Sequence, residues 1–362
     1  LGRAFYNRIV SESGSTYIDW ENPENNTFHL ALEVTCQNGG DEFRPDIVIF
    51  INGLPLSYIE VKQPNAIRDG KTAIQSEQSR TAVRFENRRF RRFNNITQLI
   101  SFSDNLPYIS GQGQQKQGSF YCSNAFSKTK FNAFKEEREE ELIYSIRSLG
   151  EEEIDAVLKD VNRFALKSQP EFKTNQDPST PCNTFISSLY QKERLLFVLR
   201  YGLAYVEEHS KDGTIQLQKH VMRYPQFFAT KAIEDAIEKG VKKGVIWHTQ
   251  GSGKTALSYF NIRYLTNYFS KQEIVPQFYF VVDRLDLADQ ATREFTKRGL
   301  KVKRINRPQE LNEKHDAYQV AVVNIQKFKD NSDLTDHSGY DLNRQNIYFI
   351  DEAHRSYNEK GS

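Results

Sequence analysis

Three charged residues, Asp46, Glu60 and Lys62, lie within or beside apolar runs in the first fifth of the sequence. They belong to the stretch RPDIVIFINGLPLSYIEVK, residues 44–62, whose two apolar runs and central Asn-Gly pair are typical of a β-hairpin. Charged side chains in apolar strands are costly unless they have partners or bind a metal. Two adjacent carboxylates could bind a divalent cation, and a nearby ammonium group could orient water or stabilise negative charge.

The register of this hairpin decides whether the two carboxylates meet. A two-residue turn at 52–53 would place Asp46 opposite Ile59, whereas a three-residue loop, 52–54, places it opposite Glu60. Lys62 then shares the same face, because side chains alternate along a strand. The three-residue loop therefore predicts a metal site, and the alternative is a plain hairpin with a surface ion pair between Glu60 and Lys62.

A second candidate site is the sequence WHTQGSGKT, residues 247–255. We expect a strand at 245–247, then a tight glycine-containing loop, then a helix that opens at Lys254-Thr255. Backbone N–H groups of such a loop and the helix N-terminus bind phosphate oxygens, the lysine reaches the β- and γ-phosphates, and the threonine hydroxyl binds Mg²⁺. His248 occupies a position where the strict phosphate-loop pattern has glycine. The predicted nucleotide-binding residues are Thr249, Gly251, Ser252, Gly253, Lys254 and Thr255.

The sequence IYFIDEAH, residues 347–354, supplies the acidic partner of this loop. Its apolar run predicts a buried strand that ends in Asp351-Glu352, and ligands bind at the carboxyl ends of strands in open α/β sheets. We expect Asp351 to bind Mg²⁺ and Glu352 to orient and deprotonate the attacking water. The alternative is a helix N-cap followed by an acidic residue in the first turn.

Segment composition predicts an α/β chain with more than one domain, as its 362 residues also suggest. Short apolar runs at 245–247, 278–282, 320–325 and 347–350 are typical of strands buried in a parallel sheet. A proline-containing polar segment, 168–183, predicts a loop or linker. We expect domains at 1–165 and 216–362 and a connector at 166–215.

Composition narrows the class of protein further. The hydrophobic and charged contents, 38% and 27%, are those of a soluble globular protein, and no apolar run is long enough for a membrane span. Three widely spaced cysteines argue against disulfides or a zinc site, so we expect a cytoplasmic protein without membrane contact. The net charge of +2 means that any nucleic-acid contact must use local basic surface. We also expect a fragment of a longer protein, because the sequence lacks an initiating Met.

One local basic surface is suggested by VRFENRRFRRF, residues 83–93, in which arginines alternate with phenylalanines. The arginines could bind a duplex backbone while the rings pack on the core. The alternative is an amphipathic segment with a solvated basic face. The candidate DNA-binding residues here are Arg84, Arg88, Arg89, Arg91 and Arg92.

Residues 220–362 resemble the helicase-like translocases of the DEAD/DEAH-box superfamily, since Asp351-Glu352-Ala353-His354 is that family's box. The resemblance implies a RecA-like ATPase domain in which Gln226, in RYPQ, reads adenine and His354 couples the nucleotide state to DNA. It also implies DNA-backbone contacts from Arg284, in VVDRLDLADQ, and Gln326, in VVNIQKF. The alternative for both is sheet plus solvated loop.

The spacing P-D-x(13)-E-V-K in the hairpin resembles the core of PD-(D/E)xK nucleases. This resemblance implies that Asp46 and Glu60 bind Mg²⁺, that the Val61 carbonyl adds a ligand, and that Lys62 is catalytic. Related enzymes carry a Q-x-x-x-Y helix after the lysine. This chain offers Gln75 and Gln78, but no tyrosine follows either at that spacing.

Together with NTFHLALEVT, FRRFNNITQLISFSDN and FIDEAHRSYN, the order of these motifs resembles the R subunit of type I restriction-modification enzymes. The resemblance implies ATP- and Mg²⁺-dependent translocation and cleavage of double-stranded DNA away from the recognition site. It further implies methyltransferase (M) and specificity (S) partner subunits, and a second RecA-like domain that these 362 residues do not include. Rival functions are a helicase or remodeller with a non-cleaving nuclease-like domain, and a scaffold without turnover.

Overall fold

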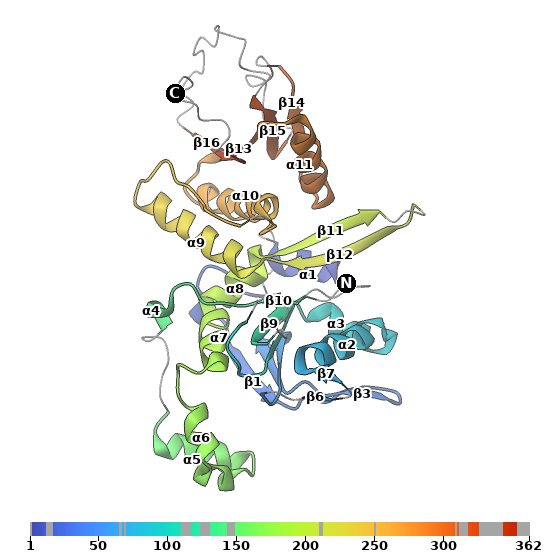
Figure 1. Cartoon of the computed structure of the whole chain (residues 1–362), viewed down its shortest axis with the longest axis vertical. Helices are drawn as coiled ribbons and strands as arrows, with labels where there is room; N and C mark the ends of the chain where they lie inside the picture. Colours follow the sequence, from blue (N-terminus) through green and yellow to red (C-terminus); the bar gives the residue numbers. More distant parts are fainter. Residues whose placement is uncertain are drawn as a thin grey trace. The chain divides into compact units, whose positions relative to one another are not determined.

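The computed structural model describes residues 2–11, 17–64, 67–68, 70–109, 117–123, 131–142, 149–209, 213–249, 251–307, 310, 318–325 and 343–352. These residues form two compact units (Figure 1). The first comprises Leu1–Leu203 with Lys219–Tyr224, and the second comprises Ala204–Gln218 with Pro225–Ser362. Both units mix helices with sheets, so the predicted α/β class is confirmed.

The first unit is built on a six-stranded sheet with the order β1-β4-β5-β8-β9-β10. Only β5 and β8 pair in parallel, and the other neighbours are antiparallel. The strands are β1 (Phe28–Leu32), β4 (Ile47–Ile51), β5 (Leu54–Val61), β8 (Leu99–Ser103), β9 (Ser119–Cys122) and β10 (Asn132–Ala133). Two short hairpins accompany the sheet: β2 (Cys36–Asn38) with β3 (Asp41–Phe43), and β6 (Ile67–Arg68) with β7 (Lys71–Thr72).

Helical elements of this unit lie on both faces of the sheet (Figure 1). On one face, the buried side chains of Val48 and Tyr58 pack with Phe85 of α2 (Ala73–Glu86) and Phe93 of α3 (Arg91–Ile96). On the other face, the hydroxyl of Tyr190, which follows α7 (Pro181–Leu189), hydrogen-bonds Ser57 of β5 at 2.9 Å. The remaining elements are α1 (Arg3–Val10), η1 (Pro23–Asn25), η2 (Arg88–Phe90), α4 (Glu139–Leu142), α5 (Glu151–Asp160), η3 (Phe164–Ser168), α6 (Pro170–Asn175) and α8 (Lys192–Tyr201).

The segment expected to be a loop or linker contains helices instead. Pro170 and Pro181 stand in the first turn of α6 and α7, where a missing N–H costs nothing because that group has no partner inside the helix. The helix α7 contributes Phe185 and Leu189 to the core of the first unit, and both side chains are buried. Proline marks the starts of these helices, so its presence alone did not indicate an unstructured connector.

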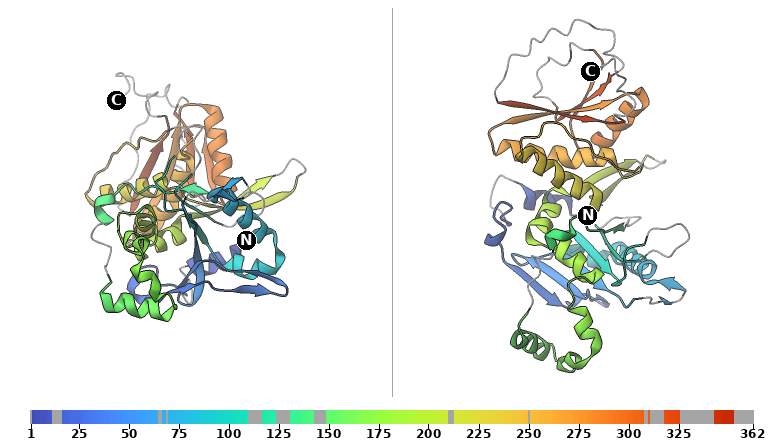
Figure 2. Two further views of the ribbon diagram at one scale, coloured as in Figure 1. Left: turned by 60° about the horizontal axis from the view of Figure 1, so that its bottom comes forward. Right: turned by 60° about the vertical axis from the view of Figure 1, so that its left-hand side comes forward.

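The second unit contains a fully parallel sheet with the order β14-β15-β13-β16, shown in two further views in Figure 2. Its strands are β13 (Val275–Val282), β14 (Val302–Ile305), β15 (Val320–Asn324) and β16 (Arg344–Ile350). Two helices, α10 (Lys254–Ser270) and α11 (Leu285–Lys297), pack against β13, and Phe295 of α11 lies edge-on to Phe280. The unit also holds α9 (Tyr224–Glu238) and most of a two-stranded sheet of β11 (Leu203–His209) and β12 (Ile215–Val221).

Three of the four strands predicted for this region are present, but the fourth is wrong. The strand β16 lies at the edge of the sheet and its residues are exposed or only partly buried, so its predicted burial is also wrong. Residues 241–249 form no strand, and the side chain of Trp247 is 92% exposed. A strand in a buried sheet needs a paired neighbour and cover on its faces, and an apolar run specifies neither. Among the described residues, no helix has both the length and the apolar character of a membrane span.

Candidate functional site

The hairpin β4–β5 has the predicted register near Asp46, but a two-residue turn and a bulge produce it instead of a three-residue loop. Asn52 and Gly53 both have positive φ, 50° and 80°, so they form the two-residue turn that suits the twist of a hairpin, and the expected three-residue loop is wrong. The register shifts between Ile49 and Phe50, which pair with Ser57 and Pro55 and leave one extra residue on β5. Pro55 can stand next to this bulge because proline has no N–H to donate to the hydrogen bonds between the strands.

Beyond the bulge, Ile47 pairs with Ile59, and continuing this register by one residue places Asp46 beside Glu60. The carboxylate of Asp46 accepts a hydrogen bond from the backbone N–H of Val61 at 2.8 Å. The ammonium of Lys62 lies 2.9 Å from Glu60 Oε2 and 3.4 Å from Asp46 Oδ2. The prediction that Asp46, Glu60 and Lys62 share one face is therefore confirmed, and their chemical roles stay predictions.

A third carboxylate, missed by the sequence analysis, belongs to the same cluster. Glu77 of α2 is 1% exposed, and its Oε2 lies 3.9 Å from Lys62 Nζ. The buried residues of α2 are Ile74, Glu77, Thr81 and Arg84, a spacing that marks one helix face. The sequence could have revealed Glu77 through this spacing, which places it on the side of the helix that faces the core.

Arg84 binds two of these carboxylates, so its predicted place on an exposed basic surface is wrong. Its Nη1 lies 2.8 Å from Glu60 Oε1 and 3.4 Å from Glu77 Oε1, and the residue is buried. The guanidinium also lies over the ring of Phe43, 4.9 Å from its centroid, where the charge attracts the negative face of the ring. Arg84 therefore fixes the buried carboxylates in place.

Burial dominates the electrostatics of Glu77. It raises the pKa of this carboxyl above its ordinary value, because removal from water disfavours the charged form. The nearby charge of Glu60 raises the pKa further, while Arg84, Lys62 and Arg80 act in the opposite direction. Glu77 thus depends on its cationic neighbours to remain ionised.

Gln75 and Gln78 occupy different places around α2. Gln75 caps the helix: its Oε1 accepts the N–H of Thr72 at 3.0 Å, and its own N–H donates to Thr72 Oγ1 at 3.4 Å. This reciprocal pair is a capping box, which stabilises a helix N-terminus. The Gln75 side chain is exposed and Gln78 is partly buried. The helix that follows the lysine therefore brings Glu77 to the cluster, and the part Gln78 plays stays a prediction.

The oxygen pair of Asp46 and Glu60 fits a small divalent cation. A positive group, the ammonium of Lys62, already lies between the two carboxylates and contacts both. Among the residues that the structure describes, no three His, Cys, Asp or Glu side chains are arranged as a metal site. Mg²⁺ commonly uses one or two carboxylates and retains several waters, so two carboxylates with a backbone carbonyl such as that of Val61 suffice.

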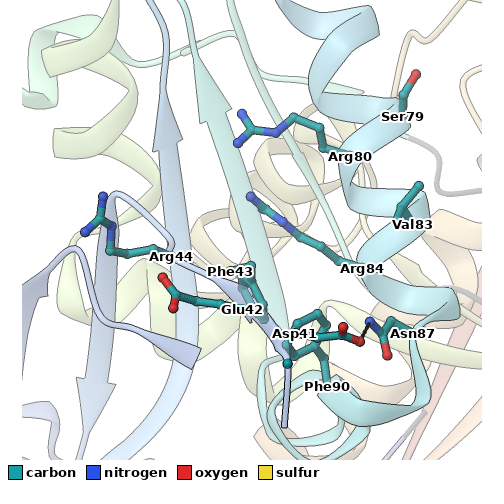
Figure 3. Close-up of a pocket in the computed structure, with 11 residues that line it drawn as sticks. Asp41, Glu42, Phe43, Arg44, Ser79, Arg80, Val83, Arg84, Asn87 and Phe90 are labelled. Carbon is teal, nitrogen blue, oxygen red and sulfur yellow. Dashed lines mark hydrogen bonds between the residues drawn. The ribbon is translucent and has the colours of Figure 1, made fainter. Parts of the chain in front are cut away.

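A pocket of about 620 Å³ lies beside the cluster and shares Arg84 with it (Figure 3). Arg80 and Arg84 extend from α2 toward the side of the pocket from which Arg44 projects. The Arg80 and Arg44 side chains are about half exposed. The pocket is lined by Gly40, Asp41, Glu42, Phe43, Arg44, Ser79, Arg80, Val83, Arg84, Asn87 and Phe90.

The other arginines of the basic segment lie on η2 and α3, outside the lining of this pocket. They are Arg88, Arg89, Arg91 and Arg92, and all four are exposed. Phe90 is buried, and Phe85 and Phe93 pack against the core, so the prediction that these rings dock on the core is confirmed. Contact of these arginines with DNA stays a prediction.

The predicted phosphate loop of the second unit leads directly into α10. Gly251 and Gly253 have positive φ, 79° and 86°, and Lys254 is the first helical residue. The buried side chain of Gln226, expected to read adenine, donates from Nε2 to the carbonyls of Ser252 and Gly253 at 3.2 and 3.0 Å. Gln226 therefore ties α9 to the loop. Thr249 is exposed, Thr255 is partly buried, and Gln250 lies outside the described residues.

Asp351 and Glu352 follow β16, and they lie near the lysine of this loop. Lys254 Nζ is 4.0 Å from Glu352 Oε1, and Asp351 Oδ1 accepts the N–H of Glu352 at 3.0 Å. Burial raises the pKa of the Asp351 carboxyl, and the charges of Glu352 and Asp283 add to that rise. A cation at this position would relieve the repulsion among these carboxylates, so the group fits Mg²⁺.

Three further predicted residues concern contact with DNA or its coupling to the nucleotide. Arg284 is exposed at the start of α11 and pairs with Asp286 at 2.6 Å. Gln326 and His354 lie outside the described residues. Their roles stay predictions.

Comparisons with known proteins match both units. Residues 2–140 match the family model described as type I restriction enzyme R protein N terminus, and residues 225–361 match the model described as SWI2/SNF2 ATPase. The two models together cover most of the chain. They occur in the order that the motifs predict.

Individual relatives agree with these family models. The type I restriction enzyme HindI endonuclease subunit of Haemophilus influenzae is 27% identical over 357 residues, which are 94% of this chain and 28% of that protein. A Methanocaldococcus jannaschii protein named for the MjaIXP endonuclease subunit of such an enzyme is 26% identical over 386 residues, 98% of this chain and 32% of that protein. The SauCOLORF180P endonuclease subunit of Staphylococcus aureus is 37% identical over 145 residues, 37% of this chain and 14% of that protein.

The chain spans less than a third of the length of these relatives. The two matched regions and the relatives that align with nearly its whole length point to the same kind of protein. The chain is similar to the N-terminal part of the R subunits of type I restriction enzymes.

Proposed function

We propose that this chain carries the nuclease centre and the nucleotide-binding part of an ATP-dependent DNA-translocating restriction endonuclease. The first unit, Leu1–Leu203 with Lys219–Tyr224, acts as a PD-(D/E)xK nuclease domain, and the second unit acts as the first RecA-like ATPase domain. Residues 166–203, expected to belong to a connector, are part of the first unit, because α7 packs in its core. The observation that carries the proposal is the contact of Lys62 with both Asp46 and Glu60 on neighbouring strands. The two family models support the same assignment.

In the nuclease centre, Asp46 and Glu60 with the carbonyl of Val61 would hold Mg²⁺. The bound ion would supply a positive charge that polarises the scissile phosphate and a coordinated water. Lys62, on the same face, orients the attacking water or stabilises the negative charge that develops on the phosphate. The Arg84 guanidinium holds the Glu60 carboxylate in position at 2.8 Å.

In the ATPase domain, Lys254 binds the β- and γ-phosphates of ATP, and the backbone N–H groups of residues 251–253 surround the phosphate oxygens. Thr255 and Asp351 would hold Mg²⁺, which screens the phosphate charge. Glu352 orients the attacking water. The 4.0 Å separation of Lys254 Nζ and Glu352 Oε1 supports a shared site.

Double-stranded DNA approaches the nuclease centre across the pocket next to it. Arg44 and Arg80 are half exposed in the lining, which also includes Asp41 and Glu42, and exposed arginines beside a metal site bind the sugar-phosphate backbone. Arg84 lines this pocket and contacts Glu60, so DNA held there lies next to the cluster. Sequence recognition then falls to the S subunit and methylation to the M subunit, with which the chain assembles.

Replacing Lys62 by alanine in the full-length protein, assembled with its partner subunits, tests the proposal. Cleavage should fall by at least about 10²-fold, because an aimed positive charge is lost at the scissile phosphate. DNA-stimulated ATPase activity should persist. Lys71→Ala, at an exposed lysine of β7 in the same unit, is the matched control.

The same variants separate the proposal from its rivals. Unchanged cleavage in Lys62→Ala, or loss of both activities, would count against a nuclease centre at Lys62. Lys254→Ala should abolish ATP binding, translocation and the cleavage that depends on translocation. If the wild-type assembly translocates DNA without cutting it, the non-cleaving helicase or remodeller is the better description.

A further inference from the structure

Glu77 is a buried acidic group that the proposed cleavage chemistry does not use. Its Oε1 accepts hydrogen bonds from Thr81 Oγ1 at 3.2 Å and from Arg84 Nη1 at 3.4 Å. Its Oε2 is buried, and the structure gives it no hydrogen-bond partner. The nearest cations to this oxygen are Arg80 Nη1 at 3.6 Å and Lys62 Nζ at 3.9 Å. A buried carboxylate oxygen without a donor is costly, so it calls for a donor in another state of the site.

Lys62 is the donor that can move there. Its side chain is 22% exposed, and its ammonium lies 2.9 Å from Glu60, 3.4 Å from Asp46 and 3.9 Å from Glu77. A divalent cation held by Asp46 and Glu60 would compete with the ammonium for the same oxygens and repel it. Of the three carboxylates around Lys62, only that of Glu77 then remains for it. The shift required is small, because Oε2 of Glu77 already lies just beyond hydrogen-bond distance.

We propose that Glu77 is a positioning residue that receives the Lys62 ammonium when a divalent cation occupies the Asp46–Glu60 pair. The inference rests on the proposed nuclease function. It describes how the divalent ion replaces the Lys62 ammonium at Asp46 and Glu60. Glu77 keeps Lys62 beside the scissile phosphate and out of the metal position. Arg84 and Thr81 hold the opposite oxygen of Glu77, so Oε2 stays on the side of Lys62 and Arg80, at 3.9 and 3.6 Å from their charged nitrogens.

A double-mutant cycle in divalent-ion binding tests this coupling without relying on cleavage. Binding of Ca²⁺ and Mg²⁺ to the full-length protein without nucleotide is measured by calorimetry, and heat that persists in Asp46→Ala is subtracted. Glu77→Gln should weaken binding by about 10- to 100-fold, the usual effect of losing a group that orients a metal site. In a Lys62→Ala background the same substitution should have little effect, because no ammonium then competes with the ion.

Matched controls separate positioning from a general loss of structure. Glu86→Gln makes the same chemical change at an exposed position of α2 and should leave divalent binding unchanged. Thermal unfolding of Glu77→Gln should remain a single cooperative transition, and DNA-stimulated ATPase activity should persist. The Mg²⁺ concentration needed for half-maximal cleavage should rise in parallel with the weaker binding.

The outcomes distinguish this inference from the proposed function. An equal effect of Glu77→Gln with and without Lys62 would overturn the positioning role, because Glu77 would then act on the ion directly or through the fold. Unchanged binding in Glu77→Gln would overturn it as well. If wild-type protein and Asp46→Ala bind divalent ions alike, the proposed nuclease centre itself fails.

Discussion

The carboxylate cluster of the first unit and the phosphate loop of the second both place a lysine near acidic side chains, but they differ in burial. In the cluster, Lys62 is 22% exposed and contacts Glu60 at 2.9 Å. In the loop, Lys254 is 40% exposed and its nearest acidic partner, Glu352, is 4.0 Å away. The cluster is held together by side-chain contacts between strands and a helix. The loop is shaped by its backbone and leaves its lysine available for a ligand.

This difference predicts where substitution costs stability. Arg84→Ala leaves two buried carboxylates without their cation, so the chain should lose about 3–5 kcal/mol of unfolding free energy. Lys254→Ala, in the phosphate loop, should change it by less than about 0.5 kcal/mol because its charge is partly solvated. Chemical denaturation measures both variants.

Arg92→Ala, at an exposed arginine of α3, is the control for loss of an arginine and should be nearly neutral. Similar losses for Arg84→Ala and Lys254→Ala would contradict the contrast between a buried cluster and an open loop. A neutral Arg84→Ala would mean that the carboxylates find other partners or bind protons instead.

The contribution of one exposed arginine in each unit to DNA binding extends this comparison. Arg80 of the first unit and Arg284 of the second are half exposed, at 52% and 53%, and each faces an acidic side chain. If each binds a phosphate, either alanine variant should lower the salt dependence of DNA affinity by about 0.9 in the log–log slope. Arg80→Ala should reduce cleavage while ATPase activity persists, and Arg284→Ala should reduce the stimulation of the ATPase by DNA.

Titrations of DNA affinity against salt concentration check these slopes. Arg91→Ala represents the exposed arginines outside the pocket. If its slope falls as much as that of Arg80→Ala, the basic surface extends beyond the pocket. If only Arg91→Ala changes the slope, DNA binds at α3 and the pocket has another use.

The sequence predicted elements and sites that depend on local pattern. Apolar runs located β4, β5, β13, β15 and β16, and residue spacing located Asp46, Glu60 and Lys62. It did not predict the bulge, because the extra residue opposite Ile49 and Phe50 depends on how two strands pair around Pro55. The predicted register beside Asp46 was therefore correct, but the bulge that produces it cannot be read from the residue pattern alone.

The errors share a physical cause: they concern which other element a segment contacts. The sequence interpretation missed Glu77 because it compared α2 with a glutamine motif and considered Gln75 and Gln78. The buried face of α2 contains Glu77 and neither glutamine. The run at 245–247 was predicted as a strand from its composition, although no strand pairs with it in the described structure. Arg84 was assigned to the surface because charge alone does not reveal a buried partner.

Substitution of one glycine in each unit should have the smallest effects in this comparison of the two units. Gly53 in the β4–β5 turn and Gly253 in the phosphate loop both have positive φ, so alanine at either should cost about 1–2 kcal/mol of unfolding free energy. At Gly53 an added Cβ meets open space, whereas at Gly253 it would lie 2.6 Å from Gln226 Nε2.

Gly253→Ala should therefore also displace the Gln226 amide and weaken ATP binding, while Gly53→Ala should leave ATP binding unchanged. Denaturation and nucleotide titration of the two variants measure these effects. Weaker ATP binding in Gly53→Ala would show that the turn and the nucleotide site are coupled. Unchanged ATP binding in Gly253→Ala would show that Gln226 is free to move and that its contact with the loop does not shape the phosphate site.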